Sequence, residues 1–195
     1  MSVATQKPLE RQRLLNVPNQ LTGLRLLLSL VLFVLMAFEY YFASTLVFVV
    51  AAGTDWLDGY WARKYGQVTN LGRILDPFVD KIIVCGTFIF LAAVPESGVR
   101  AWMAVVVVGR ELLVTALRSY LEGEGADFSA SMSGKLKMTV QCLAATLSLY
   151  ALSLVERHET LELAVTASVW AAILLTLYSG VIYIRRAIEL LRRSG

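Results

Sequence analysis

Long apolar runs, separated by short polar stretches, fill most of the chain between residues 21 and 185. The runs are about 15 to 23 residues long, close to the roughly 20 residues that a helix needs to cross a bilayer. They lack the alternation of apolar and polar residues that marks the strands of a membrane barrel. Because lipid cannot satisfy open backbone groups, the pattern predicts membrane-spanning α-helices. The six predicted helices cover residues 21–40, 43–62, 77–95, 99–121, 135–155 and 161–185.

Composition agrees with this pattern, since 57% of the 195 residues are hydrophobic and only 17% are charged. We therefore expect an all-α, polytopic membrane protein with one membrane domain over residues 21–195. Residues 1–20 are expected to form a cytoplasmic segment, in which residues 8–17 form either a short interfacial helix or a disordered tail. No small-residue cleavage site follows the basic start, so we do not expect a signal peptide.

Basic residues gather at one set of helix ends, whereas only Arg100 and Arg157 fall clearly at the other set. An even number of spans puts both termini on one side, and the positive-inside rule makes that side cytoplasmic. The net charge of +3 is modest, and membrane topology alone accounts for the distribution of the basic residues. Nothing in this pattern indicates a nucleic acid as partner.

Few residues outside the acidic and basic groups offer chemistry. Cys85 and Cys142 lie inside apolar runs without the spacing of a metal or redox motif, so we expect buried, inert thiols. His158 is the only histidine and falls between the fifth and sixth predicted helices, on the far side of the membrane from the acidic residues described next. An imidazole base is therefore not expected, and the chain has no phosphate-loop or serine-hydrolase motif.

Four aspartates occupy facing ends of the second and third predicted helices. Asp55 and Asp58 are three residues apart, and Asp76 and Asp80 are four apart, so each pair shares a helical face. If the two helices form a hairpin, the four carboxylates converge, and their repulsion in a low dielectric calls for divalent cations. Hard oxygen ligands favour Mg²⁺ or Mn²⁺, and four carboxylates suit two ions. The plainer alternative is ion pairing at the membrane edge with basic neighbours such as Arg63.

The motif around these acids resembles the signature of the CDP-alcohol phosphotransferases, also called CDP-alcohol phosphatidyltransferases. No position of the signature is missing. The resemblance implies six transmembrane helices, with the active site at the cytoplasmic ends of the second and third, in the inner membrane of a bacterium. It also implies a homodimer. The motif reads Asp55-x-x-Asp58-Gly59-x-x-Ala62-Arg63, then eight residues, then Gly72-x-x-x-Asp76-x-x-x-Asp80.

The same resemblance implies a reaction in which an alcohol hydroxyl attacks the phosphorus of a CDP-linked lipid and CMP leaves. It makes Asp55, Asp58 and Asp76 ligands of two Mg²⁺ or Mn²⁺ ions. Asp80 becomes the candidate general base and a possible fourth ligand. The residues that the resemblance assigns to the CDP-lipid site are Gly59, Ala62, Arg63 and Gly72.

The alcohol must be selected by residues outside the signature. Arg110 and Glu111 lie about ten residues inside the fourth predicted helix, where a cation is costly and therefore indicates function. Together with Arg118, Lys135 and Lys137, Arg110 is predicted to bind the phosphate of a phosphorylated acceptor. The plainer interpretation of Arg118 and the two lysines is that they anchor helix ends by snorkelling.

The surroundings of these basic residues resemble one branch of the family, whose acceptor is sn-glycerol 3-phosphate. That branch commonly has Thr where this chain has Met138, and Thr139 follows one position later. The branch makes phosphatidylglycerophosphate from CDP-diacylglycerol, for the synthesis of phosphatidylglycerol and cardiolipin. The runs that carry the resemblance are Gly109-Arg110-Glu111-Leu112, Leu117-Arg118, Gly134-Lys135-Leu136-Lys137 and Pro18-Asn19-x-Leu21-Thr22-x-x-Arg25.

Three alternatives stay open at this point. Phosphatidylinositol phosphate synthases of the same family also need cations for a phosphorylated acceptor. Cardiolipin synthases of the family accept phosphatidylglycerol and need less cationic binding. An ion or metal transporter would use the acidic cluster as its intramembrane site, but the other half of the chain has no matching cluster.

Overall fold

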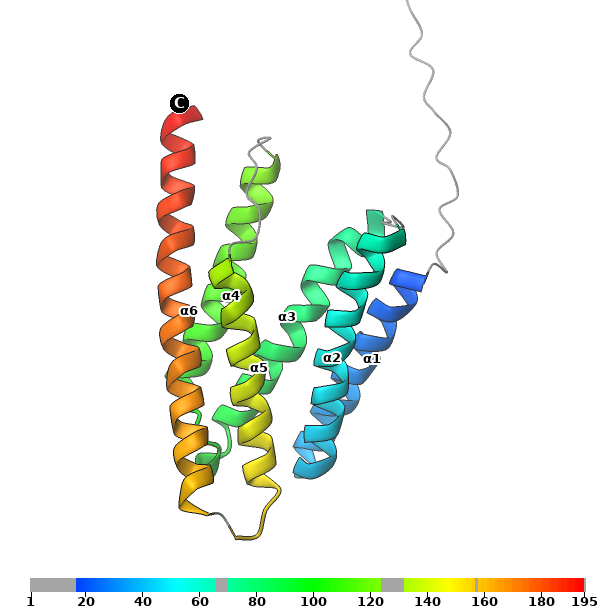
Figure 1. Cartoon of the computed structure of the whole chain (residues 1–195), viewed down its shortest axis with the longest axis vertical. Coiled ribbons are helices and arrows are strands. Elements are labelled where there is room, and N and C mark those ends of the chain that lie inside the picture. Colours follow the sequence, from blue (N-terminus) through cyan, green and yellow to red (C-terminus); the bar gives the residue numbers. More distant parts are fainter. Residues whose placement is uncertain (1–16, 66–69, 124–131, 157, 195) are drawn as a thin grey trace, which may run out of the picture.

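The computed structural model describes residues 17–65, 70–123, 132–156 and 158–194 (Figure 1). Within these ranges the chain forms six α-helices and one short 3-10 turn, and no strand. An all-α fold is therefore confirmed for the described residues. The elements are α1 (Val17–Ala37), α2 (Tyr41–Tyr65), α3 (Asn70–Ala92), η1 (Pro95–Ser97), α4 (Ala101–Gly123), α5 (Met132–Leu152) and α6 (Glu159–Ser194).

Each predicted segment coincides with one helix, and the two largest departures from the predicted bounds are in α3 and α6. Helix α3 begins at Asn70, before the apolar run that starts at residue 77, and α6 continues past residue 185 to Ser194. Both extensions mix apolar with polar and charged residues, so hydropathy alone does not detect them, although their residues permit a helix. The suggested interfacial helix over residues 8–17 falls almost entirely outside the described residues.

The outer surface of the helices is strongly apolar. Large side chains such as Phe42, Val105 and Leu174 are more than half exposed, a condition that soluble monomers rarely show over a wide area. Among the described residues, α6 alone is long and apolar enough to cross a membrane, over Glu159–Leu190. Helices α1, α2, α3 and α5 contain shorter apolar stretches of 10–17 residues. Six helices are confirmed within the described ranges, whereas six membrane crossings stay a prediction.

The main core draws at least one buried side chain from every helix. Helix α5 packs against α2, α3 and α6, α1 packs against α2 and α3, and α4 packs against α3 and α6. Fully buried examples, one from each helix in order, are Leu32, Phe48, Phe88, Val107, Leu149 and Ile173.

A glycine allows α1 and α3 to approach closely. A Cβ atom built on Gly86 of α3 would overlap the tip of the Phe33 ring of α1, so the ring would have to shift before another side chain could occupy this position. The Phe33 ring stacks on Phe90, one turn further along α3, with 5.5 Å between ring centroids. This contact fixes how α3, the helix that carries Asp76 and Asp80, sits against α1.

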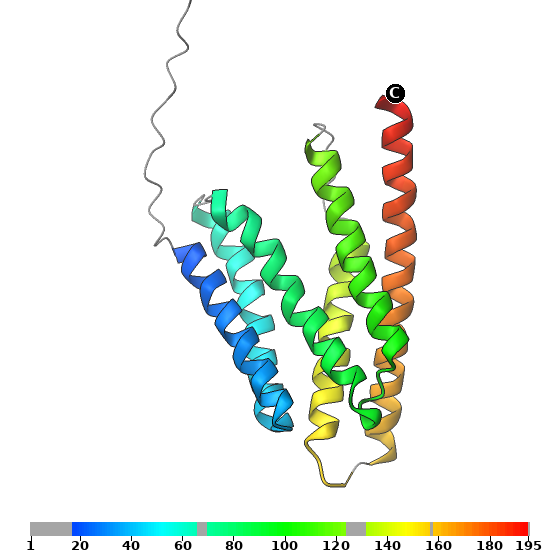
Figure 2. The same ribbon diagram turned by 180° about the vertical axis from the view of Figure 1, so that it is seen from behind.

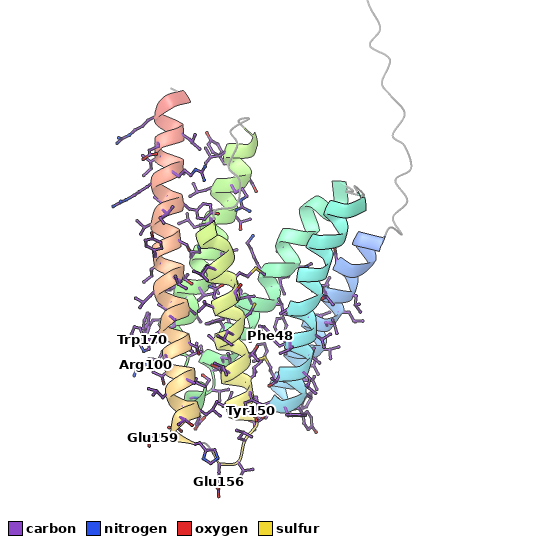
Figure 3. The ribbon with its side chains drawn as sticks, in the orientation of Figure 1. Phe48, Arg100, Tyr150, Glu156, Glu159 and Trp170 are labelled. Carbon is purple, nitrogen blue, oxygen red and sulfur yellow. The ribbon has the colours of Figure 1, made fainter. Side chains whose placement is uncertain are left out.

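The two ends of the bundle differ. The ends of α2 and α3 that flank residues 66–69 lie at the same end as the last turns of α4 and α6 and the first turn of α5 (Figures 1 and 2). The loop between α5 and α6, which contains His158, lies at the opposite end, close to the labelled Glu156 and Glu159 (Figure 3). The predicted separation of the histidine from the helix ends that carry the aspartates is confirmed.

Candidate active site

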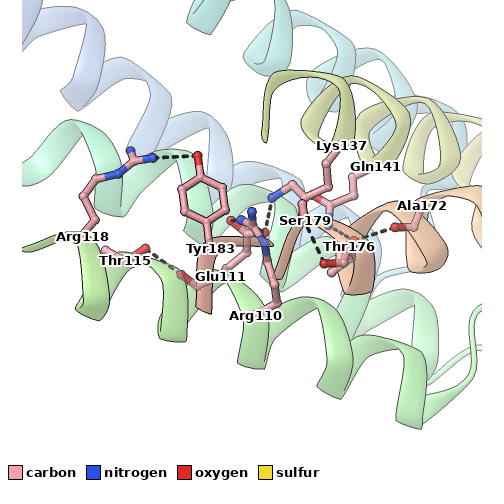
Figure 4. A network of polar contacts seen from close by, with 10 residues as sticks. All are labelled: Arg110, Glu111, Thr115, Arg118, Lys137, Gln141, Ala172, Thr176, Ser179 and Tyr183. Carbon is pink, nitrogen blue, oxygen red and sulfur yellow. Dashed lines mark hydrogen bonds and ion pairs between the residues drawn. The ribbon is translucent and has the colours of Figure 1, made fainter. Parts of the chain in front are cut away.

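Three helices place polar side chains on the faces that meet each other. Residues three, four, seven or eight positions apart share a helical face, and the polar residues of α4, α5 and α6 follow this spacing. They form the network of Figure 4, which lies between helices whose outer faces are apolar. The network consists of Arg110, Glu111, Thr115 and Arg118 from α4, Lys137 and Gln141 from α5, and Ala172, Thr176, Ser179 and Tyr183 from α6.

Glu111 is the buried acceptor for two cations. The Nζ atom of Lys137 donates a hydrogen bond to Oε1 of Glu111, and Nη1 of Arg110 donates to the same oxygen at 3.3 Å. Lys137 is only 3% exposed and Glu111 only 6%. Lys137 is therefore not a snorkelling anchor, because its ammonium group is held inside the helix bundle by a carboxylate.

Arg110 and Arg118 keep donors that this network does not use. The Nε and Nη2 atoms of Arg110 and the Nε atom of Arg118 are buried and have no hydrogen-bond partner among the described residues. Leaving a buried donor unpaired costs about 1–3 kcal/mol, and more when the group is charged. Two guanidinium groups with unused donors in one interior region are suited to an anion, and above all to a phosphate.

Tyr183 of α6 lies between these two arginines (Figure 4). The guanidinium carbon of Arg110 lies 5.3 Å from the centroid of the Tyr183 ring, and that of Arg118 lies 6.0 Å from it. Nη2 of Arg118 donates to the Tyr183 hydroxyl at 3.4 Å. One turn earlier on α6, Gly180 leaves room for the stem of Arg110, since a Cβ there would be 3.3 Å from Cγ of Arg110.

Hydroxyl and amide groups join α5 to α6 beside the ion pair. Nε2 of Gln141 donates to the hydroxyl of Thr176 at 2.9 Å, and that hydroxyl donates to the carbonyl of Ala172 at 2.6 Å. The hydroxyl of Ser179 donates to the carbonyl of Thr176 at 3.1 Å. Of these three contacts, the one from Gln141 to Thr176 joins two helices, and such bonds hold helices together where the surroundings are apolar.

The structure brings together three of the four residues predicted to bind the acceptor phosphate. Arg110, Arg118 and Lys137 belong to the network of Figure 4, but Lys137 acts as the partner of Glu111 and not as a free cation. The side chain of Lys135 lies outside the described part. Sequence reasoning did not assign Glu111 or Tyr183 to the site. The spacing of Thr176, Ser179, Gly180 and Tyr183, which share one face of an apolar helix, is the signal that points to α6.

The four aspartates have a described backbone only. Asp55 and Asp58 lie in the final turns of α2, and Asp76 and Asp80 lie in the first half of α3, so the helical spacing within each pair is present. Their side chains fall outside the described part, as do those of Ala62 and Arg63 in the signature, and the surroundings of Gly59 and Gly72 are likewise not described. Among the described residues no group of three or more His, Cys, Asp or Glu could hold a metal. The metal, base and CDP-lipid assignments therefore stay predictions.

Comparison with known proteins identifies the family. The family model for CDP-alcohol phosphatidyltransferases matches residues 15–178, and the chain belongs to the CDP-alcohol phosphatidyltransferase family. The match covers the signature, α4, α5 and the polar face of α6 as far as Thr176. The resemblance based on the signature is thus confirmed.

The curated relatives are more specific. The chain is 32% identical over 199 residues to the CDP-diacylglycerol--glycerol-3-phosphate 3-phosphatidyltransferase of Bacillus subtilis, covering 92% of this chain and 99% of the relative. Proteins of the same name from Haemophilus influenzae and Escherichia coli K12 are each 32% identical over 177 residues and match 88% of this chain. The match covers 93% and 94% of these two relatives, respectively.

Proposed function

We propose that the chain transfers the phosphatidyl group of CDP-diacylglycerol to sn-glycerol 3-phosphate, forming phosphatidylglycerophosphate and releasing CMP. The names of the relatives indicate both substrates. The structural observation that carries the proposal is the pair of partly buried arginines, Arg110 and Arg118, with buried donor atoms left over for a phosphate. Phospholipid biosynthesis is the role that such a product implies.

The charge of the network favours a phosphomonoester as acceptor. Arg110, Arg118 and Lys137 are cations, and Glu111 is the one carboxylate drawn among them. A phosphomonoester such as glycerol 3-phosphate carries close to two negative charges at neutral pH, as phosphorylated side chains do. The phosphodiester of phosphatidylglycerol carries one. This balance supports glycerol 3-phosphate over the acceptor of a cardiolipin synthase.

Different residues of the chain have different roles in the proposed reaction. Arg110 and Arg118 hold the acceptor phosphate and thereby align the acceptor hydroxyl with the lipid-side phosphorus of CDP-diacylglycerol. Asp80 accepts the hydroxyl proton as the new P–O bond forms, while the bond to CMP breaks. The residues proposed to line the site of the cytidine diphosphate group are Gly59, Ala62, Arg63 and Gly72.

The donor chemistry of the signature fits a divalent metal. Asp55, Asp58, Asp76 and Asp80 would supply carboxylate oxygens, the ligands that Mg²⁺ and Mn²⁺ prefer. Two such ions, when bound, stabilise negative charge on the diphosphate.

We further propose that six helices cross the bacterial inner membrane with both termini in the cytoplasm. The apolar outer surface and the basic residues on the last turns of α6, such as Arg185 and Arg192, support this arrangement. The homodimer that the family resemblance implies is part of the same proposal.

The test compares acceptors in one assay. The purified chain, in mixed micelles with CDP-diacylglycerol and Mg²⁺ or Mn²⁺, is given radiolabelled glycerol 3-phosphate, inositol phosphate or phosphatidylglycerol at equal concentration. We expect turnover with glycerol 3-phosphate and little with the other two. Equal or faster turnover with either of the others would contradict the assignment of the acceptor.

A further inference from the structure

The two arginines of the proposed acceptor site both contact the ring of Tyr183. Tyr183 is 2% exposed, and its ring has both guanidinium carbons within 6.0 Å of its centroid. A cation above an aromatic face is attracted by the electrons of the ring. Two cations near each other repel, and this repulsion grows in a low dielectric. A ring that attracts both therefore helps to keep them together before any anion arrives.

The hydroxyl of Tyr183 also makes a directional contact with one of the arginines. It accepts a hydrogen bond from Nη2 of Arg118 at 3.4 Å, a long contact that is weak by itself. The ring and the hydroxyl therefore act together on Arg118. This contact occupies one nitrogen of the guanidinium group, and Nε of Arg118 stays without a partner among the described residues.

Packing fixes the position of Tyr183 itself. The side chain belongs to a small buried cluster with Val114 and Leu121 of α4 and Ala187 of α6, separate from the main core. This cluster holds the C-terminal half of α6 against the same helix that carries both arginines. A displacement of Tyr183 relative to Arg110 and Arg118 would require the cluster to open.

We propose that Tyr183 is a positioning residue, which holds Arg110 and Arg118 so that their unused N–H groups bind one phosphomonoester. The inference rests on the proposed function, because it concerns the acceptor of that reaction. The described polar and aromatic contacts of Tyr183 are with the two arginines of the proposed acceptor site. Its loss should therefore weaken acceptor binding and leave the use of CDP-diacylglycerol unchanged.

Two variants separate the ring from the hydroxyl. Tyr183→Phe removes the hydrogen bond to Arg118 and keeps the ring, whereas Tyr183→Leu removes both. Tyr178→Phe is the matched control, because Tyr178 lies on the same helix and is 61% exposed. Steady-state assays give kcat and the KM of each substrate. We expect Tyr183→Phe to raise the KM for glycerol 3-phosphate about 3- to 10-fold, and Tyr183→Leu to raise it by more, roughly 10- to 100-fold.

The same assays contain the outcomes that would overturn the inference. The KM for CDP-diacylglycerol should stay within about twofold of the wild-type value in both variants, since a change of that size is within the usual scatter of surface effects. An unchanged KM for glycerol 3-phosphate in Tyr183→Leu, or an equal rise in the KM of both substrates, would show that Tyr183 is a structural residue only.

A second measurement does not depend on turnover. The thermal unfolding of the purified full chain is followed in detergent with sodium phosphate, and with sodium chloride at equal ionic strength. We expect phosphate to raise the midpoint of the wild-type chain and of Tyr178→Phe, and to raise that of Tyr183→Leu by less. An equal rise in all three would contradict the role of Tyr183. A wild-type chain that is stabilised by phosphate but makes no phosphatidylglycerophosphate would instead contradict the proposed function.

Discussion

Glu111 of α4 and Lys137 of α5 form an ion pair in the interior of the bundle, and Arg110 shares the same carboxylate oxygen. The side chains of the pair are almost fully buried, so water cannot replace either partner. The ion pair thereby ties the helix that carries both arginines to a helix on the opposite side of the site (Figure 4).

Replacing Glu111 should destabilise the chain. Glu111→Gln keeps the shape of the side chain but leaves Lys137 and Arg110 without a counter-charge, and breaking a buried pair typically costs about 3–5 kcal/mol. Unfolding of the detergent-solubilised chain by denaturant measures the loss. The double variant Glu111→Gln with Lys137→Met should recover part of the stability. Glu162→Gln, on the exposed first turn of α6, serves as the control and should change little.

Arg110 should matter for the acceptor more than for the CDP-lipid. Arg110→Ala removes charge-assisted hydrogen bonds, each worth about 1.5–3 kcal/mol, so we expect the KM for glycerol 3-phosphate to rise by roughly 10- to 100-fold. Arg110→Lys should restore little of this, because an ammonium group lacks the planar fork of donors. Arg100→Ala, at an exposed position before α4, is the matched control. An unchanged KM in Arg110→Ala would make Arg110 a structural residue.

Asp80 should be required for turnover and not for lipid binding. Asp80→Asn removes the proposed proton acceptor, and loss of a general base typically slows a reaction about 10²- to 10⁴-fold. Binding of radiolabelled CDP-diacylglycerol should be largely retained. Full activity of Asp80→Asn would remove the assignment of the base, whereas loss of lipid binding would indicate that Asp80 acts mainly as a metal ligand.

Removal of divalent ions should abolish the reaction reversibly. Four carboxylates that converge as predicted would need cations to offset their repulsion, and the diphosphate would need them for charge stabilisation. We expect a chelator to stop product formation, and an excess of Mg²⁺ or Mn²⁺ to restore it. Activity that persists after exhaustive chelation would contradict the predicted metal site.

The contact between α1 and α3 predicts a steric effect. Gly86→Ala places a methyl group against the ring of Phe33, and such overpacking costs typically about 1–3 kcal/mol. Thermal unfolding should reveal the loss, and Phe33→Ala in the same chain should relieve the clash. Gly23→Ala on α1 is the control, because a Cβ at Gly23 meets nothing within 4 Å. Equal thermal unfolding midpoints for Gly86→Ala and Gly23→Ala would show that α1 can move away from α3 without a loss of stability.

The sequence was sufficient to predict the helices and to single out Arg110, Arg118 and Lys137, which the structure brings into one polar network. Apolar runs predicted six segments that coincide with helices. The energetic cost of a cation inside a predicted membrane helix indicated a functional role for Arg110. Apolar runs do not determine how one helix is rotated about its axis relative to its neighbour. For this reason the sequence does not predict that Lys137 pairs with Glu111, although both are charged residues in predicted helices. Tyr178 and Tyr183 look alike in the sequence of α6, yet one is exposed and the other is buried between two arginines.

The length of α6 has a consequence for how the two substrates meet. Its 36 residues extend for roughly 54 Å at 1.5 Å per residue, whereas the hydrocarbon layer is only about 30 Å thick. When its apolar stretch, Glu159–Leu190, lies in a bilayer, α6 is long enough for its last turn to reach beyond the hydrocarbon layer. If the chain acts as proposed, a water-soluble phosphate ester can approach along this end of α6, while the insoluble lipid donor stays in its leaflet.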